Sequence, residues 1–143
     1  MDFQALLPAG LHTKTMREIQ TLCIESFAKI SPKRELLFNS LITNLLQPLE
    51  QTGLKCNVWI DGSFVTEKTE PNDIDLVIEA NDTINQNQNA INLLSPILMN
   101  NAVFKSICKC DVYFFYKNNS RDRAYWKGQF CFDRSDSSKG III

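Results

Sequence analysis

The sequence predicts an α/β (α+β) fold, in which a small, mixed, twisted sheet is flanked by helices. Two observations predict this class, and the chain length predicts the number of domains. In three segments, apolar residues recur every three or four positions, as they do on the buried face of a helix. Three other segments are short, rich in β-branched and aromatic residues, and bounded by turn residues, as strands are. The chain of 143 residues is long enough for one core and short for two, so we expect a single domain.

Three segments are expected to be helical: residues 14–29, 32–51 and 83–100. The second begins favourably, because Ser31 is a good N-cap and Pro32 suits the first helical position. Pro48 is expected to kink or end this helix, and Gly53 supplies the turn beyond it. In the third segment, several asparagines lower the helix propensity and Pro96 interrupts the pattern.

Three segments are expected to be strands: residues 55–60, 73–79 and 107–116. The first contains Val-Trp-Ile and the last contains Val-Tyr-Phe-Phe-Tyr, and both runs favour β structure. The Ile-Ile-Ile ending after Gly140 can form a short final strand. Along the chain, this gives a helical N-terminal part at 14–51, a core at 54–116 and a C-terminal segment at 117–143.

The C-terminal segment is basic within a chain of almost neutral charge. The formal net charge is −1, but residues 117–143 contain six Lys or Arg and three Asp, a local charge of +3. Two interpretations stay open. The cations form a solvated face above buried aromatic residues, or some of them complete a site and contact phosphate or a base. The cations are Arg121, Arg123, Lys127, Arg134 and Lys139, interleaved with Trp126, Phe130 and Phe132.

The composition and the spacing of motif residues argue against several classes of protein. The N-terminus lacks the pattern of a signal peptide, and no apolar run approaches the ~20 residues that span a bilayer. Five cysteines without regular spacing argue against a disulfide framework, so we expect a reducing cytoplasm. Cys108-Lys109-Cys110 and a single histidine fall short of a zinc site. No EF-hand or P-loop pattern occurs, and a Cys–His nucleophilic pair would have only His12.

One stretch raises a question of chemistry. Residues 61–79 read D-G-S-F-V-T-E-K-T-E-P-N-D-I-D-L-V-I-E. Asp is rare in strands, and Asp73 and Asp75 would project from the same face of one strand and repel each other. Either they face water while the alternate apolar residues face the core, or a divalent cation lies between them. Oxygen-rich carboxylate sites suit Mg²⁺.

The order of these features resembles the nucleotidyltransferase superfamily, which includes polymerase beta and the minimal nucleotidyltransferases. Its signature is a hydrophobic residue before Gly-Ser, a loop, two carboxylates one residue apart on the next strand, and a third carboxylate on a later strand. The matching residues are Gly62-Ser63-Phe64, Asp73-Ile74-Asp75-Leu76 and Asp111. The two chain ends and the turn W-I-D-G-S-F-V-T-x-K resemble a poorly characterised bacterial and phage group of this kind.

The resemblance implies a nucleotidyltransferase fold and a reaction. In that reaction, a nucleotidyl group from a nucleoside triphosphate, typically AMP from ATP, passes to a hydroxyl of a protein, an RNA or a small molecule. Asp73, Asp75 and Asp111 would be the catalytic residues that bind Mg²⁺ or Mn²⁺, and Asp111 would also help to activate the hydroxyl. By analogy, the protein would act in a toxin–antitoxin or phage-defence pair. The oligomeric state stays open.

The resemblance also implies the residues that bind the nucleotide: Gly62, Ser63, Thr66 and Lys68. Glycine lets the backbone approach the triphosphate, and the Ser63 hydroxyl can donate a hydrogen bond to a phosphate. Minimal nucleotidyltransferases have Arg-Gly after the Gly-Ser turn, whereas this chain has Thr66-Glu67. Glu67 would repel phosphate unless the loop turns it outward, although Lys68 can substitute for the arginine.

A second hypothesis follows from this departure. The chain could keep the fold as a catalytically degenerate module that binds a partner or a nucleotide. Glu67 favours that hypothesis, and the three aspartates favour the enzyme. Asp61 is interpreted as a turn residue, and Lys33 and Arg34 as surface cations at the start of a helix.

Overall fold

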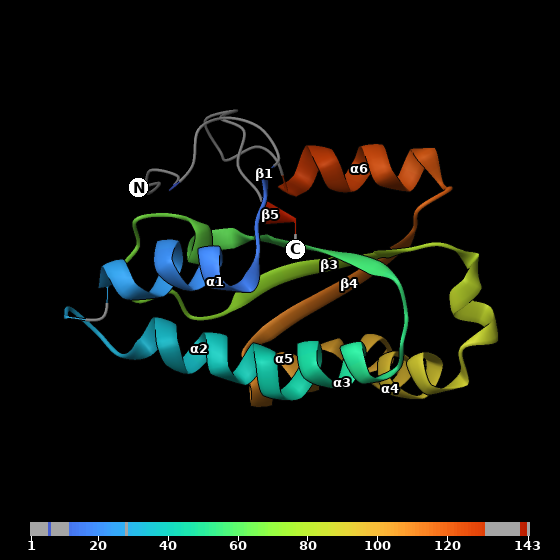
Figure 1. The fold of residues 1–143 in the computed structure, drawn as a ribbon, viewed down its shortest axis with the longest axis horizontal. Coiled ribbons are helices and arrows are strands. Elements are labelled where there is room, and N and C mark those ends of the chain that lie inside the picture. Colours follow the sequence, from blue (N-terminus) through green and yellow to red (C-terminus); the bar gives the residue numbers. More distant parts are fainter. Residues whose placement is uncertain (1–5, 7–11, 28, 131–140, 143) are drawn as a thin grey trace.

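A computed structural model of the chain describes residue 6 and residues 12–27, 29–130 and 141–142. Its centre is a five-stranded mixed sheet of order β1-β5-β2-β3-β4, flanked by helices (Figure 1), which confirms the predicted class. The strands are β1 (His12–Thr13), β2 (Cys56–Asp61), β3 (Ile74–Ala80), β4 (Cys110–Tyr116) and β5 (Ile141–Ile142). The helices before β3 are α1 (Met16–Ile19), η1 (Gln20–Ile24), η2 (Glu25–Phe27), α2 (Lys33–Leu41), η3 (Ile42–Leu46), α3 (Gln47–Gln51) and η4 (Gly62–Val65). Those after β3 are η5 (Asp82–Gln86), α4 (Gln88–Met99), α5 (Asn101–Cys108) and α6 (Ser120–Phe130).

Of the three long strands, β3 is the most completely buried, and β4 at the sheet edge keeps exposed residues. β2 runs antiparallel to β3, and β3 runs parallel to β4. Helices α2 to α5 lie on one side of the sheet and α6 lies on the other (Figure 1). On the first side, Ile74 and Ile78 of β3 are fully buried in the main core. On the second side, a smaller apolar cluster packs under α6: Trp59, Val77, Phe115 and Trp126.

The helices expected at 14–29 and 32–51 are present, although Pro48 does not end the second one. This helix continues through Pro48 to Gln51. The π-helical segment η3 ends at Leu46, and α3 begins at Gln47, so that Pro48 is the second residue of a new α-helical segment. Proline is tolerated there because the first turn needs no N–H donor from that position. Gly53 then turns the chain with a φ of 74°, as expected.

The segment expected as one helix at 83–100 is divided in two. A short 3₁₀ helix, η5, is followed by α4, which continues through Pro96 to Met99. Two other asparagines, which were not among those expected to weaken the helix, serve as N-caps. Asn81 accepts a hydrogen bond from the N–H of Thr83, and Asn87 accepts one from the N–H of Ala90. Side-chain caps of this kind stabilise helix starts.

The strand expected at 107–116 begins later in the structure than predicted. Residues 101–108 form helix α5, and β4 starts at Cys110. Phe104 packs against the main core and Cys108, four residues later, is buried. This helical spacing of buried residues overrides the β propensity of Val103 and Ile107. Lys109 ends the helix in the left-handed conformation, with φ 60°, and leads directly into β4.

The C-terminal segment contains a helix that the sequence pattern did not reveal, namely α6. The short final strand is confirmed, since β5 pairs with both β1 and β2. Of the basic and aromatic residues named above, Phe132, Arg134 and Lys139 lie outside the described residues. No helix in the described part of the chain is long and apolar enough to cross a membrane.

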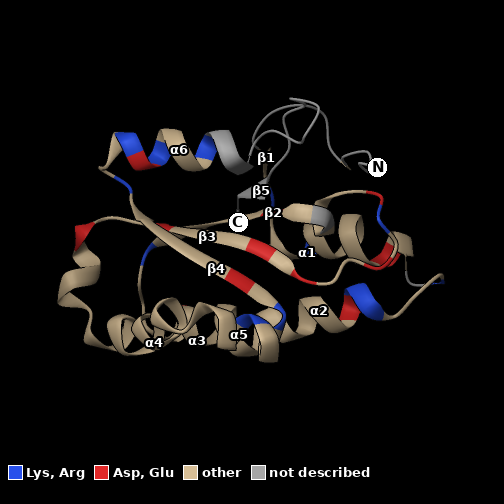
Figure 2. Ribbon diagram, turned by 180° about the vertical axis from the view of Figure 1, so that it is seen from behind, with Lys and Arg blue, Asp and Glu red and all other residues tan. Residues whose placement is uncertain are grey.

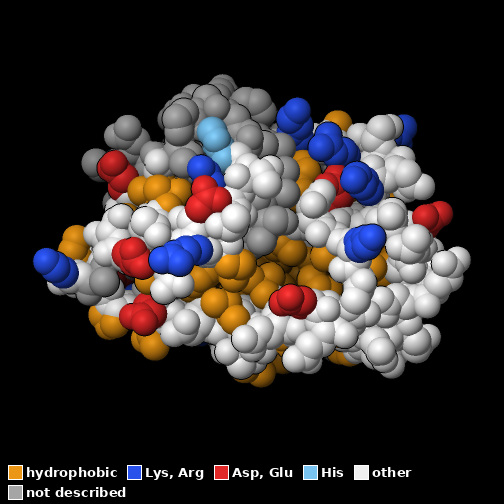
Figure 3. Space-filling model, in the orientation of Figure 1, with side chains coloured by type: hydrophobic (Ala, Val, Ile, Leu, Met, Phe, Trp, Pro, Cys, Tyr) orange, Lys and Arg blue, Asp and Glu red, His pale blue; other side chains and the backbone are white. Residues whose placement is uncertain are grey.

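A hollow of about 440 Å³ opens between α1, α3 and β2. Hydrophobic side chains gather at the surface on this face of the molecule (Figure 3). The hollow is lined mainly by apolar side chains, among them Met16, Leu46 and Leu54. None of the candidate site residues lines it, so the chemistry of the sequence motif lies elsewhere.

Candidate functional site

An acidic row crosses one end of the sheet. Asp61, the last residue of β2, pairs with Asp75 of β3, and Asp75 pairs with Asp111 of β4. Residues in register on neighbouring strands project from the same face, and such strands lie ~4.8 Å apart. Asp73 precedes Asp75 by two residues and therefore belongs to that face as well. Acidic segments of β3 and β4 lie next to each other in Figure 2. The structure thus brings together Asp73, Asp75 and Asp111, and adds Asp61.

Asp61 is not a turn residue, and that interpretation was wrong. It ends β2, its side chain is buried, and it stands opposite Asp75 in the sheet. The turn begins only with the next residue, Gly62. Because β2 and β3 are antiparallel, the end of β2 lies beside the start of β3, which is why Asp61 joins the row.

Gly62 lies directly against Asp75, so any side chain at this position would be strained. Its φ is +81°, a conformation that side chains disfavour. A Cβ placed on it would lie 3.0 Å from Cγ of Asp75 and closer still to Oδ2. Ser63 follows within η4, and its side chain lies outside the described part of the structure. The Gly-Ser turn therefore caps the acidic row, as the sequence motif predicts.

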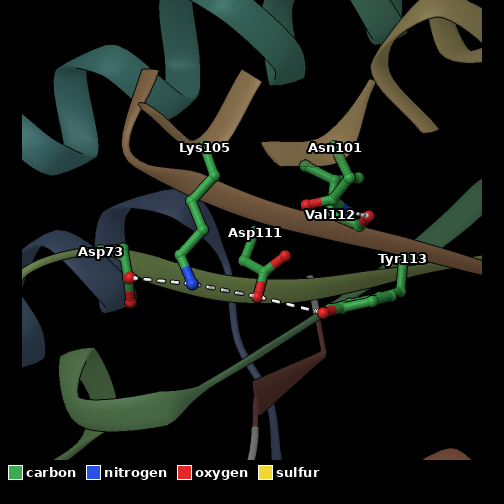
Figure 4. Close-up of polar contacts among 6 residues, drawn as sticks. All are labelled: Asp73, Asn101, Lys105, Asp111, Val112 and Tyr113. Atoms are coloured by element: carbon green, nitrogen blue, oxygen red, sulfur yellow. Dashed lines mark hydrogen bonds and ion pairs between the residues drawn. The ribbon is translucent and has the colours of Figure 1, made fainter. Parts of the chain in front are cut away.

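Lys105 of α5 reaches into the site and was missed by the sequence analysis. Its Nζ lies 3.5 Å from Oδ2 of Asp73 and 3.5 Å from Oδ2 of Asp111 (Figure 4). Asp111 first, and then Asp73, raise the pKa of Lys105 above its ordinary value, so the ammonium is charged at neutral pH. The side chain is 44% exposed, so its attraction to the carboxylates is screened by water.

The ammonium of Lys105 occupies the place between two carboxylates where a metal ion was expected. Among the described residues, no three His, Cys, Asp or Glu side chains are arranged to hold a metal ion. The carboxylates nevertheless share one face through strand register, which does not depend on their rotamers. A flexible and partly exposed lysine can leave this position without any change in the backbone.

A buried arginine fixes the loop that follows the Gly-Ser turn. Arg34 is fully buried, and its guanidinium donates hydrogen bonds of 2.5–3.1 Å to the backbone carbonyls of Cys23, Phe64, Thr66 and Lys68. Its plane also lies over the Phe27 ring, 3.9 Å from the centroid. The interpretation of Arg34 as a surface cation is therefore wrong. Carbonyls of a tight loop need donors, and the planar guanidinium supplies several at once.

The three loop residues after the turn have different environments. Thr66 is buried, and its Oγ1 accepts a hydrogen bond from the N–H of Lys68 at 3.3 Å. The Thr66 side chain therefore stabilises the loop to which it belongs. Lys68 is half-buried, whereas Glu67 is exposed to solvent. Glu67 would repel phosphate only if it faced the site. Its exposure to solvent is compatible with a loop that turns it outward.

An aromatic pair borders the acidic row on β4. The Tyr113 hydroxyl donates a hydrogen bond of 3.2 Å to Oδ2 of Asp111, and burial and then Asp111 raise the pKa of this phenol. The Tyr113 ring lies 4.9 Å from the ring of Trp126 on α6. A groove of about 670 Å³ runs along this edge of the sheet. Its lining includes Lys105, Asp111, Tyr113 and Trp126.

Helix α6 is anchored to the same face of the sheet. Nε of Arg123 lies 3.0 Å from Oε2 of Glu79, whose side chain is buried on β3. Asn57 donates a second hydrogen bond, of 2.8 Å, to Glu79 Oε1. Arg123 and Trp126 therefore hold the helix in place, while Arg121 and Lys127 are exposed. The described cations Arg121, Arg123 and Lys127 are exposed, as a solvated face requires, and contact of any of them with phosphate or a base stays a prediction.

Comparison with known proteins assigns the chain to a family. The model of a family of unknown function (DUF6932) matches residues 1–143. The chain belongs to this family. Comparison with curated proteins and with solved structures gave no match. The family description names no activity for DUF6932, so the chemistry of the site is the basis for a proposal.

In this DUF6932 chain, two further functional residues escaped sequence reasoning for separate reasons. Lys105 fell between the helix expected at 83–100 and the strand expected at 107–116, so the sequence analysis gave it no role. The helical spacing of Asn101, Phe104, Lys105 and Cys108 was the available signal. Arg34 carried no local signal, because an arginine in the first turn of a helix is usually solvated.

Proposed function

We propose that this protein is a metal-dependent nucleotidyltransferase. It would transfer a nucleotidyl group to a hydroxyl, with AMP from ATP as the expected group. The observation that carries the proposal is the strand register, which sets Asp75 beside Asp111 with Gly62 over Asp75. Attack on an α-phosphate needs charge neutralisation and placement more than covalent help. A row of carboxylates under an open glycine turn suits that requirement.

The carboxylates of the acidic row are ligands of a type that suits Mg²⁺ or Mn²⁺, although the described side chains do not surround one position. Asp73, Asp75 and Asp111 offer hard carboxylate oxygens from adjacent strands, and these are the donors that both ions prefer. The position of Lys105 supports the same conclusion, because it indicates that a cation is favourable between these carboxylates. When bound, the metal would neutralise charge that develops on the transferred phosphoryl group.

The chain's own residues would perform the remaining tasks. Gly62 leaves the backbone open to the triphosphate, with Ser63 beside it, and Lys68 is the cation of the loop. Thr66 would act by supporting that loop. Asp111 would accept the proton of the attacking hydroxyl, since it lies at the edge of the row that faces the groove.

The acceptor and the setting belong to the proposal as well. A hydroxyl of a protein, an RNA or a small molecule can reach Asp111 through the groove. The expected setting is the reducing cytoplasm, and a toxin–antitoxin or phage-defence pair would supply a protein acceptor. The described cysteines are free thiols.

One observation favours the second candidate, a catalytically degenerate binding module. Lys105 neutralises part of the acidic row without any metal. In a protein without catalytic activity, this ion pairing with Lys105 could stabilise the carboxylates in place of a metal. The two candidates differ in whether a divalent cation can displace the lysine from Asp73 and Asp111.

The proposed function is tested by label transfer. The full chain is incubated with each α-labelled nucleoside triphosphate, Mg²⁺ or Mn²⁺, and a lysate, and the label is then located. The enzyme hypothesis expects metal-dependent transfer to a defined acceptor. Absence of transfer with every triphosphate and both metals, in the presence of the natural partner, would leave the binding module as the function.

Metal binding should be limited by Lys105. We expect Mg²⁺ or Mn²⁺ to raise the melting temperature by mass action, and Asp75→Asn to remove most of that effect. Lys105→Met removes a competing charge, so Mg²⁺ affinity should increase up to roughly fivefold for an interaction of about 1 kcal/mol. Isothermal titration calorimetry measures the affinity. Lys117→Met, at the opposite end of β4, is the matched control. Equal Mg²⁺ affinity in Lys105→Met and wild type would show that Mg²⁺ and the Lys105 ammonium do not compete for the same position.

A further inference from the structure

Tyr113 presents a hydroxyl to the carboxylate that would receive the acceptor's proton. The phenol donates its hydrogen bond to Oδ2 of Asp111 at 3.2 Å (Figure 4). Tyr113 follows Asp111 by two residues on β4, so both side chains project from the same face. Tyr113 as a whole residue is 38% exposed, and it borders the groove. The chain therefore places one of its own hydroxyls where an external acceptor hydroxyl would have to lie.

The position of this phenol is fixed by packing. The Tyr113 ring stacks at a tilt on Trp126, which Tyr125 in turn contacts edge-on at 5.0 Å. Trp126 belongs to α6, and the ion pair of Arg123 with Glu79 anchors that helix. The ring is thus held between a strand and an anchored helix. Preorganised placement of reacting groups is a large part of catalysis.

Tyr116 provides an internal comparison on the same strand. It has the same exposed fraction, 38%, but its hydroxyl donates to Oδ1 of Asn85 at 3.2 Å. Asn85 lies in η5, which follows the opposite end of β3 from Asp75. Exposure alone would make the two phenols equivalent. Only Tyr113 lies against a member of the acidic row.

We propose that Tyr113 is a site of self-nucleotidylation, an inference that rests on the proposed function. The phenolic oxygen attacks the α-phosphorus of a nucleoside triphosphate and forms a new P–O bond. The bond from that phosphorus to the bridging oxygen breaks, and pyrophosphate leaves with the electron pair. The phenolic proton passes to Asp111 and from there to solvent. The product is a phosphodiester between Tyr113 and the nucleoside, and no atom changes oxidation state.

The surroundings of Tyr113 can hold this product. The groove opens beside the ring and leaves room for a nucleoside without entry into the core. Lys105 borders the same groove and can pair with the phosphodiester anion once it has left the carboxylates. One modified tyrosine per chain would fill the place of the acceptor and limit further transfer.

Peptide mass mapping tests the inference. The full chain is incubated with ATP and Mg²⁺ in the absence of any other protein, and modified peptides are then located. The label is expected on Tyr113, lost in Tyr113→Phe and unchanged in Tyr116→Phe. Phenylalanine keeps the contact with Trp126, so the variant should fold, and its circular dichroism spectrum checks this. Label on another residue, or equal labelling of Tyr113→Phe and wild type, would overturn the inference but not the proposed function. No transfer to this chain or to any acceptor in a lysate would overturn both.

A second measurement needs no turnover. Tetranitromethane nitrates accessible tyrosines, and site-resolved mass spectrometry follows each one. The α,β-methylene analogue of ATP, whose nucleotidyl group cannot be transferred, should slow nitration of Tyr113 severalfold in the presence of Mg²⁺ and leave Tyr116 unaffected. Equal rates for Tyr113 with and without the analogue would show that nucleotide does not bind beside this hydroxyl, and would overturn the inference.

Discussion

Asp75→Ala is expected to lower the rate of nucleotidyl transfer by about 10²–10³, the usual cost of removing one group that stabilises transition-state charge. Asp75 is the central member of the acidic row, with Asp61 and Asp111 beside it in register. It also lies directly under Gly62. No neighbour can replace it, because the adjacent strands hold their own carboxylates at fixed positions. The initial rate with α-labelled ATP and a defined acceptor measures the effect, and Asp73→Ala should behave alike.

The same substitution should leave the fold intact. Three carboxylates in register repel one another, so loss of the central charge relieves repulsion and should leave the melting temperature unchanged or higher. Asp82→Ala is the control, since Asp82 is exposed in η5, beyond the opposite end of β3. Transfer at the wild-type rate in Asp75→Ala would exclude the proposed site. A binding module would keep its partner affinity in Asp75→Ala and lose it when exposed cations of α6 such as Lys127 are replaced.

Arg34→Met is expected to lower the free energy of unfolding by about 3–5 kcal/mol, at the upper end for single substitutions. The guanidinium is fully buried and serves carbonyls of Cys23, Phe64, Thr66 and Lys68. Methionine fills much of the volume but donates nothing, so these carbonyls lose their partners inside the protein. Urea denaturation measures the difference. Transfer activity should fall as well, because the loop after the Gly-Ser turn loses its support.

Lys33→Met is the matched control for Arg34→Met. Lys33 precedes Arg34 in the same helical turn, but its ammonium makes an exposed hydrogen bond of 3.0 Å to Asn72. Exposed polar contacts contribute little to stability, so this variant should change it by less than about 0.5 kcal/mol. Arg34→Lys should lie between the two, because an ammonium has fewer donors and no planar fork. Equal stability of Arg34→Met and Lys33→Met would mean that Arg34 does not hold the loop.

The sequence by itself determined the local geometry of the candidate site. Strand periodicity placed Asp73 and Asp75 on one face, opposite Ile74 and the other core residues of β3. The Gly-Ser turn could be predicted because a glycine at such a turn indicates a positive φ or a close approach of another group to the backbone. Gly62 has a positive φ and lies against Asp75. These features depend on neighbours within a few residues along the chain.

Only the tertiary structure decided which groups meet Asp75 and what supports them. Asp61 joins the row through antiparallel pairing, and Asp111 joins it through a parallel crossover that spans α4 and α5. Lys105 reaches two carboxylates because packing made its segment helical, and Arg34 is buried because a loop more than thirty residues away closes over it. Side-chain direction is local, since it follows from backbone geometry. Strand order, register and burial are not local, since they follow from how helices and sheet pack into one core.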